Sequence, residues 1–244
     1  MTEPPSTKPG YGPVPARPRI FTPGDFAARL PRRAPLLSGE PPFDRDNCVD
    51  TGVGIAFKSV DRFDLLTTYI SPRGLMVLSD VVLEINHRAD ETLEPGHDRI
   101  RGRVKKACSG LQYELRIGSM TVRELPEEFI HEVLHVQEVV RKHSKPRDED
   151  DFEDARHAGE AASIVWARSQ KPMAVVLTND GGAQRAADEL GVLWLNSAQV
   201  MKYLIDGGAI EAAEAWTLIN KMDEVSKIMG PYPEDSTWGR LTDR

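Results

Sequence analysis

Short apolar runs alternate with segments of helical periodicity along most of the chain, and this alternation limits the possible folds more than any other feature. The runs lie at 48–49, 75–78, 173–177 and 192–195. Continuous short apolar runs are typical of strands buried on both faces, and strands that alternate with helices usually pair in parallel. The sequence therefore predicts an α/β fold built on a central parallel sheet.

The segments after these runs carry apolar residues at helical spacing. A helix is predicted directly after the first run, and Ser79 and Asp80 are predicted to cap a second helix that continues through Ala89. Gly207 and Gly208 are predicted to separate the last two helices, because glycine favours the turn that ends a helix. The further predicted helices are 155–169, 182–190, 197–206 and 209–229.

Composition divides the chain into a tail, one main domain and a short end. Residues 1–42 hold 11 of the 18 prolines and are predicted to form an extended tail. Apolar residues such as Phe21 and Phe26 give this tail a means of packing on the domain surface. The main domain is predicted at 43–230, followed by a C-terminal tail at 231–244.

Residues 91–152 interrupt the alternation and are predicted to form a helical insertion. Two long helices are expected at 97–117 and 125–143, with no strand in the insertion. Basic residues from Arg99 to Lys106 and acidic residues from Asp148 to Asp154 each form a charged run. Both runs are either solvated surface or functional. In the functional interpretation the basic run contacts an RNA backbone, and the acidic run is a flexible or partner-binding loop.

The bulk composition is that of a globular protein of a reducing compartment. At 244 residues the chain can bury one core, and its net charge of −7 argues against a surface coated for nucleic-acid binding without excluding a local basic patch. Two cysteines provide neither a disulfide framework nor a cysteine zinc site. No run approaches the ~20 apolar residues of a membrane helix, and no signal peptide is visible, so we expect a soluble, cytoplasmic protein without a membrane partner.

Four acidic residues stand in apolar surroundings that folding alone does not explain. They are Asp50, Glu84, Glu160 and Asp180, in the segments CVDTGVGI, SDVVLEI, HAGEAASIVWA and VVLTNDGGAQRAADELGV. A buried carboxylate without a partner costs several kcal/mol, so such surroundings indicate a bound cation.

The predicted elements bring the four acids toward one end of the sheet. Asp50 and Asp180 follow predicted strands, and the carboxyl ends of parallel strands form the crevice where ligands bind. Glu84 and Glu160 are expected on helices that flank this crevice. Oxygen ligands select hard cations, Mg²⁺ or Mn²⁺, over zinc. Three polar residues adjoin the acids and are expected to orient them or to hold a water on the metal: Thr51, Thr178 and Asn179.

In this order and spacing, the four segments resemble the PIN domain, a family of metal-dependent nucleases that includes toxins of bacterial toxin–antitoxin modules. The resemblance runs from Asp50 to about Ile210, apart from the insertion. It implies a three-layer α/β/α fold in which the four acids bind Mg²⁺ or Mn²⁺ and are the catalytic residues. It further implies that Thr51 supports them, that Arg185 is near enough to meet a phosphate, and that the protein is an endoribonuclease acting on RNA, with an antitoxin as a partner.

Two features depart from the family pattern. The tail and the insertion make the chain longer than a compact toxin, so a toxin and a processing nuclease both stay open. Asn179 stands where many relatives carry a second Asp, which leaves Asp180 as the acid expected to act.

A rival motif predicts a different class of enzyme. His131, Glu132 and His135 form H-E-x-x-H, which on a helix binds zinc and activates water in metalloproteases. Glu153 and Glu160 are the candidate third ligands, and the two histidines otherwise border the apolar face of a helix. The other four histidines are expected on the surface: His87, His97, His143 and His157.

A third interpretation is a nuclease-like fold that no longer cuts and serves as a binding or regulatory module. The last helices carry an apolar stripe from Ala212 to Ile228. This stripe either packs in the core or forms a surface for an antitoxin, or for a second copy in a homodimer.

Overall fold

The computed structural model of the chain describes residues 45–71, 74–93, 99–144 and 157–226. The two predicted tails, His97 and the acidic run from Asp148 to Asp154 lie outside these residues.

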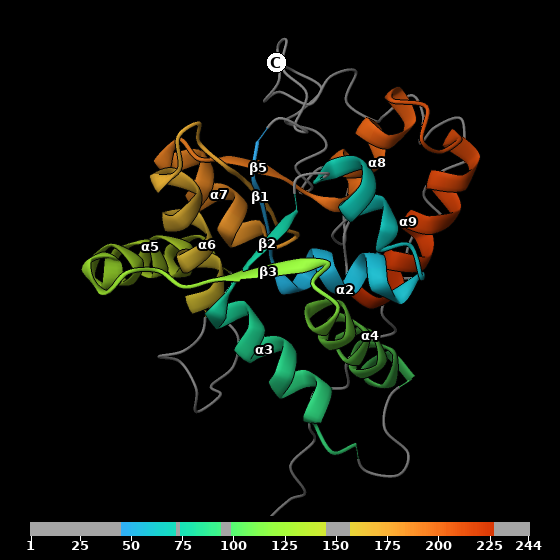
Figure 1. Ribbon diagram of the computed structural model, residues 1–244, viewed down its shortest axis with the longest axis horizontal. Coiled ribbons are helices and arrows are strands. Elements are labelled where there is room, and N and C mark those ends of the chain that lie inside the picture. The colour runs from blue at the N-terminus through green and yellow to red at the C-terminus, as the bar shows by residue number, and fades with distance from the viewer. Residues whose placement is uncertain (1–44, 72–73, 94–98, 145–156, 227–244) are drawn as a thin grey trace, which may run out of the picture.

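A five-stranded sheet forms the centre of the molecule, in the spatial order β3-β2-β1-β4-β5 (Figure 1). Every neighbouring pair is parallel, and Cys48 in the central strand lies opposite Met76 on one side and Val176 on the other. This arrangement confirms the predicted parallel α/β sheet. The strands are β1 (Asn47–Val49), β2 (Leu75–Leu78), β3 (Met120–Arg123), β4 (Val175–Leu177) and β5 (Leu193–Leu195).

Helices cover both faces of the sheet, which gives the three-layer α/β/α architecture (Figure 1). One layer contains α2 (Thr51–Ser59), α4 (Arg99–Arg116), α8 (Ser197–Asp206) and α9 (Ala212–Ser226). The other contains α5 (Ile130–His143), α6 (Ala158–Ser169) and α7 (Gly181–Leu190). Helix α3 (Ser79–Asp90) contacts both α4 and α6. The short π-helix η2 (Leu66–Ile70) precedes β2, and the short 3₁₀-helix η3 (Glu127–Phe129) precedes α5.

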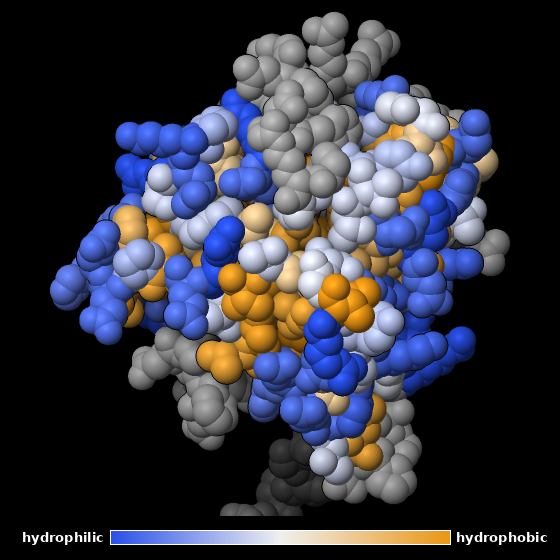
Figure 2. All heavy atoms as spheres, in the orientation of Figure 1, coloured by the Kyte–Doolittle hydropathy of each residue, from blue (hydrophilic) through white to orange (hydrophobic). Residues whose placement is uncertain are grey.

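Strand β3 corrects the prediction that 91–152 contain no strand. It pairs with β2 along all four of its residues and forms an edge of the sheet. Only Met120 is buried, so MTVR lacks the apolar run by which the other four strands are recognised. Helix α4 packs on α2, α3 and α9, so this region is part of the main domain and not a separate helical body. On the face of the molecule that is turned to the viewer in Figure 1, Figure 2 shows apolar residues gathered around β3 and surrounded by hydrophilic residues.

The predicted cap of α3 was also wrong. The helix starts directly after β2, its N-cap is Leu78, and Ser79 and Asp80 lie inside its first turn. Because the strand runs into the helix without a loop, the last strand residue takes the cap position and makes no side-chain cap bond.

The core lies between the sheet and both helical layers. Helix α9, which carries most of the predicted apolar stripe, contributes to it: four residues of the helix are buried, and the helix packs on α2. Both cysteines are buried and free, and burial raises the pKa of the Cys48 and Cys108 thiols to about 12. Among the described residues, no helix combines the length and the apolar character needed to cross a membrane.

Candidate metal centre

The candidate site lies where the order of the strands reverses. From β1 the chain adds β2 and β3 on one side, and then crosses to add β4 and β5 on the other. In open parallel sheets, ligands bind outside the carboxyl ends of the strands at such a switch point. Asp50 directly follows β1, and Asp180 stands three residues after the end of β4. The fold therefore brings these two acids to the position where a ligand is expected.

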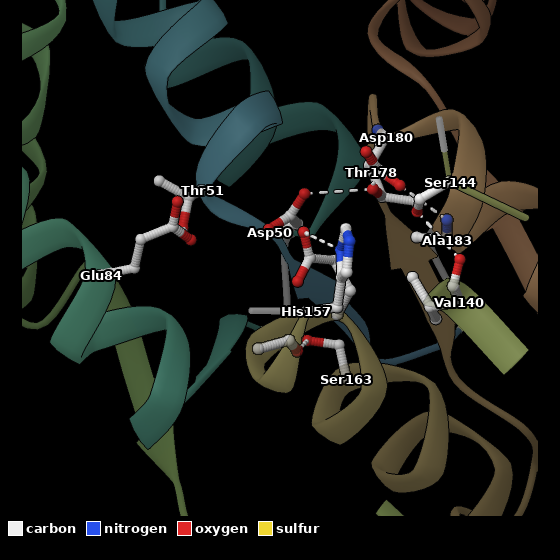
Figure 3. A network of polar contacts seen from close by, with 12 residues as sticks. Asp50, Thr51, Glu84, Val140, Ser144, His157, Ser163, Thr178, Asp180 and Ala183 are labelled. Carbon is white, nitrogen blue, oxygen red and sulfur yellow. Dashed lines mark hydrogen bonds and ion pairs between the residues drawn. The ribbon is translucent and has the colours of Figure 1, made fainter. Parts of the chain in front are cut away.

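Backbone and side-chain hydrogen bonds hold Asp50 in place. Its N–H donates to the carbonyl of Leu177 in β4 at 2.9 Å, and the residue as a whole is only 4% exposed. The Thr178 hydroxyl donates to Oδ2 of Asp50 at 3.1 Å and accepts from the N–H of Asp180, also at 3.1 Å (Figure 3). Thr178 thus links the two strand ends, as expected of a residue that orients the acids.

The electrostatic environment of Asp50 disfavours its charge. Burial raises the pKa of Asp50 well above its usual range, and the negative charges of Glu160, Glu84 and Asp180 raise this pKa further. The hydrogen bond from Thr178 acts in the opposite direction. The charges of all three predicted acid partners therefore act on Asp50, and the four residues are called the acid cluster.

Glu84 is held from two sides. Its Oε2 accepts from the Thr51 hydroxyl at 2.6 Å (Figure 3), and its Oε1 accepts from Nε of Arg88 at 2.9 Å. Arg88 lies one helical turn further along α3 and also forms an ion pair with Glu84 at 2.7 Å. Arg88 is a residue of the site that the sequence analysis did not name, although Glu and Arg four positions apart on a helix are expected to pair.

Asp180 and Asn179 anchor the ends of neighbouring helices. Asp180 is the N-cap of α7, and its Oδ1 accepts from the N–H of Ala183 at 2.8 Å. Asn179 accepts from the N–H of Ser197 at 2.9 Å and donates to its hydroxyl at 3.0 Å. The amide of Asn179 thus joins β4 to the start of α8, a role that an aspartate could fill only in part because it lacks the donor.

Arg185 is turned toward α5. Its guanidinium donates to the backbone carbonyl of His143 at the end of that helix. No described contact joins it to the four acids, so its expected meeting with a phosphate stays a prediction.

Glu160 is brought to the cluster by a close approach of α6 to α3. It lies in the first turn of α6, directly after Gly159. A Cβ on Gly159 would stand 3.1 Å from Cγ2 of Val81 in α3, tighter than ordinary contacts. The glycine therefore allows the helix that carries Glu160 to lie against the helix that carries Glu84.

We expect Gly159→Leu to destabilise the protein by about 1–3 kcal/mol, because the larger side chain must force α6 away from α3. Gly102→Leu is the matched control, since Gly102 lies in α4 with open space around its Cα. That control should leave stability unchanged or raise it by up to about 1 kcal/mol. Urea unfolding measures both, and equal effects of the two substitutions would contradict the close approach.

His157 corrects the expectation that it lies on the surface. Its side chain is only 8% exposed, and its Nδ1 lies 3.7 Å from Oε1 of Glu160. The residue precedes α6 in a left-handed conformation, with φ 67°. A sequence pattern does not show this burial, because it depends on how α6 meets the sheet. His87 is exposed as predicted, and His143 contacts Glu189 at 2.7 Å.

The rival zinc motif lies on α5. His131 and His135 are both exposed, and Glu132 forms an ion pair with Arg168 at 3.4 Å. The candidate third ligand Glu153 lies outside the described residues. In the part of the chain that is described, these histidines join no group of three side chains suited to hold a metal.

The four acids suit a hard divalent cation by their chemistry. They offer oxygen atoms, which such ions prefer, and the charge cluster around Asp50 is what a cation would neutralise. Within the described ranges, no three His, Cys, Asp or Glu side chains stand ready as a ligand set. Glu84 and Asp180 are engaged with Thr51, Arg88 and Ala183, so cation binding requires their oxygens to turn toward Asp50.

The comparisons with known proteins add no relative. No family model matches the chain, and the search of curated proteins finds no match.

Proposed function

We propose that this protein is a Mg²⁺- or Mn²⁺-dependent endoribonuclease with a PIN-like site. The observation that carries the proposal is the position of Asp50: buried, at the switch point of a parallel sheet, and surrounded by three further acids that raise its pKa. Such a cluster disfavours its own charge unless a cation is present, and it lies where ligands bind in this class of fold.

Each residue of the site has a defined part in the proposed reaction. Asp50, Glu84, Glu160 and Asp180 hold the cation, while Thr178 and Thr51 orient two of these carboxylates by the hydrogen bonds described above. A divalent cation in this position supplies charge neutralisation and lowers the pKa of water for in-line attack on phosphorus. The water oxygen would form a new bond to phosphorus and give up a proton, the bond from phosphorus to the leaving oxygen would break, and the leaving oxygen would take up a proton.

The proposed substrate is single-stranded or looped RNA, and the proposed compartment is the cytoplasm. An antitoxin and a second copy of the chain are the proposed protein partners if the protein is a toxin. Four residues of α9 are buried in the core, so only the rest of that helix is available to these partners.

A cleavage assay on full-length protein tests the proposal. We expect an end-labelled single-stranded RNA to be cut with Mn²⁺ or Mg²⁺ and left intact in EDTA. Glu160→Gln should lower the rate at least about 100-fold, because it removes a cation ligand, while His131→Ala should leave it unchanged.

Two other outcomes identify the alternatives. Stoichiometric zinc that is lost in His131→Ala, together with proteolysis, would establish the metalloprotease instead. No RNA cleavage and no binding of Mn²⁺ would favour the inactive binding or regulatory module.

A further inference from the structure

The side chain of His157 is buried without a hydrogen bond. Only 8% of it is exposed, and neither Nδ1 nor Nε2 has a hydrogen-bond partner among the described residues. Buried polar groups in folded proteins are nearly always paired, so an imidazole left in this state calls for a binding partner beyond its contact with Glu160, which the described residues do not supply.

The imidazole is directed into the acid cluster. Figure 3 shows its ring pointing from the start of α6 toward the part of the site that contains Asp50 and Thr178. The contact between Nδ1 and Oε1 of Glu160 is 3.7 Å, too long for a hydrogen bond. Two atoms that bind one divalent ion at about 2.1 Å each lie roughly 3–4 Å apart. The separation therefore suits two ligands of a shared ion.

The backbone at His157 adds a second reason for a specific role. A left-handed conformation is unfavourable for a residue with a Cβ, and residues held in it are concentrated at functional sites. Glycine adopts this conformation without strain, whereas histidine, like asparagine, is among the residues with a Cβ that tolerate it best. The chain instead places an imidazole there, three residues before Glu160.

We propose that His157 is a nitrogen ligand of the divalent cation, together with Glu160, and that it makes the site prefer a transition-metal ion such as Mn²⁺ over Mg²⁺. Mg²⁺ takes oxygen ligands almost exclusively, whereas first-row transition metals accept imidazole nitrogen. The inference rests on the proposed metal site, and it names the metal class that this site selects.

Metal binding to the full-length protein tests this ligand without reference to cleavage. Electron spin-echo spectroscopy of the Mn²⁺ complex should show coupling to ¹⁴N, and His157→Asn should abolish it. The same variant should lower the Mn²⁺ affinity at least about tenfold in calorimetric titrations, with less than about a threefold change for Mg²⁺. Asn is chosen because it tolerates the left-handed backbone, and His157→Gly serves if the Asn variant does not fold.

His135→Ala is the matched control, because His135 is an exposed imidazole on α5 and its loss should change neither measurement. No binding of Mn²⁺, absence of ¹⁴N coupling in the wild-type complex, or an equal loss of affinity for both metals would overturn the inference. Equal loss would identify His157 as the ion-pair partner of Glu160 only. Nitrogen coupling without RNA cleavage would reject the proposed nuclease activity but support His157 as a metal ligand. RNA cleavage without nitrogen coupling would support the nuclease activity but reject His157 as a ligand.

Discussion

Asp50→Asn should lower metal-dependent RNA cleavage by at least about 1000-fold while making the metal-free protein more stable. The substitution removes the central cation ligand, on which the proposed activity depends. It also removes a buried charge that three neighbouring acids disfavour, and the amide oxygen can still accept the hydrogen bond from Thr178. We expect a gain of about 1–3 kcal/mol in the free energy of unfolding at pH 8 in EDTA.

The stability difference should depend on pH with a defined sign. Because the folded state raises the pKa of Asp50, the folded protein holds this proton more tightly than the unfolded chain does. The resulting stabilisation is complete below the unfolded pKa of about 3.9 and is lost as the pH rises through the higher folded value. Wild-type protein in EDTA should therefore lose stability relative to Asp50→Asn as the pH rises above about 4.

Urea unfolding over a series of pH values checks both statements. Asp64→Asn is the control, since the side chain of Asp64 is 58% exposed and its loss should change neither stability nor cleavage. A wild-type protein that becomes more stable than Asp50→Asn as the pH rises would show that the Asp50 charge is favoured in the fold, against the environment described.

Leu177→Ala should destabilise the protein by about 2–5 kcal/mol. Leu177 is the last residue of β4, is fully buried, and packs in the centre of the core, so truncation leaves a cavity that the sheet cannot close. The bond from Asp50 to the Leu177 carbonyl belongs to the backbone and survives the substitution. Cleavage by the folded fraction at low temperature should therefore be retained.

Leu134→Ala provides the same chemical change on the surface. Leu134 lies on α5 and is 54% exposed, so its truncation should cost no more than about 0.5 kcal/mol. Denaturant unfolding of the two variants measures the difference. Similar losses of unfolding free energy for both variants would contradict the packing of Leu177 in the core that its burial indicates.

The inner sheet and the acid cluster follow from local sequence signals. Strands β1, β2, β4 and β5 are buried on both faces, so their apolar runs were visible without a structure. Once parallel pairing was predicted, the positions of Asp50 and Asp180 after two strands were enough to place them at one edge. The metal, the RNA substrate and the catalytic roles stay predictions.

Features that depend on tertiary packing were not predictable in the same way. Strand β3 buries only one residue of four, and so carries no apolar run. The burial of the His157 side chain follows from tertiary packing, and the hydrogen bond from Thr51 to Glu84 joins the start of α2 to α3. Each of these depends on how distant segments meet.

The two halves of the chain contribute equally to the acid cluster. Asp50 and Glu84 come from the part that builds β1, β2 and β3, whereas Glu160 and Asp180 come from the part that builds β4 and β5. A cation bound by all four would act as a cross-link between these halves, across the seam where β1 meets β4. Metal binding would then stabilise the folded state of the whole domain. The concentration of the metal would therefore set the stability of the protein as well as its activity.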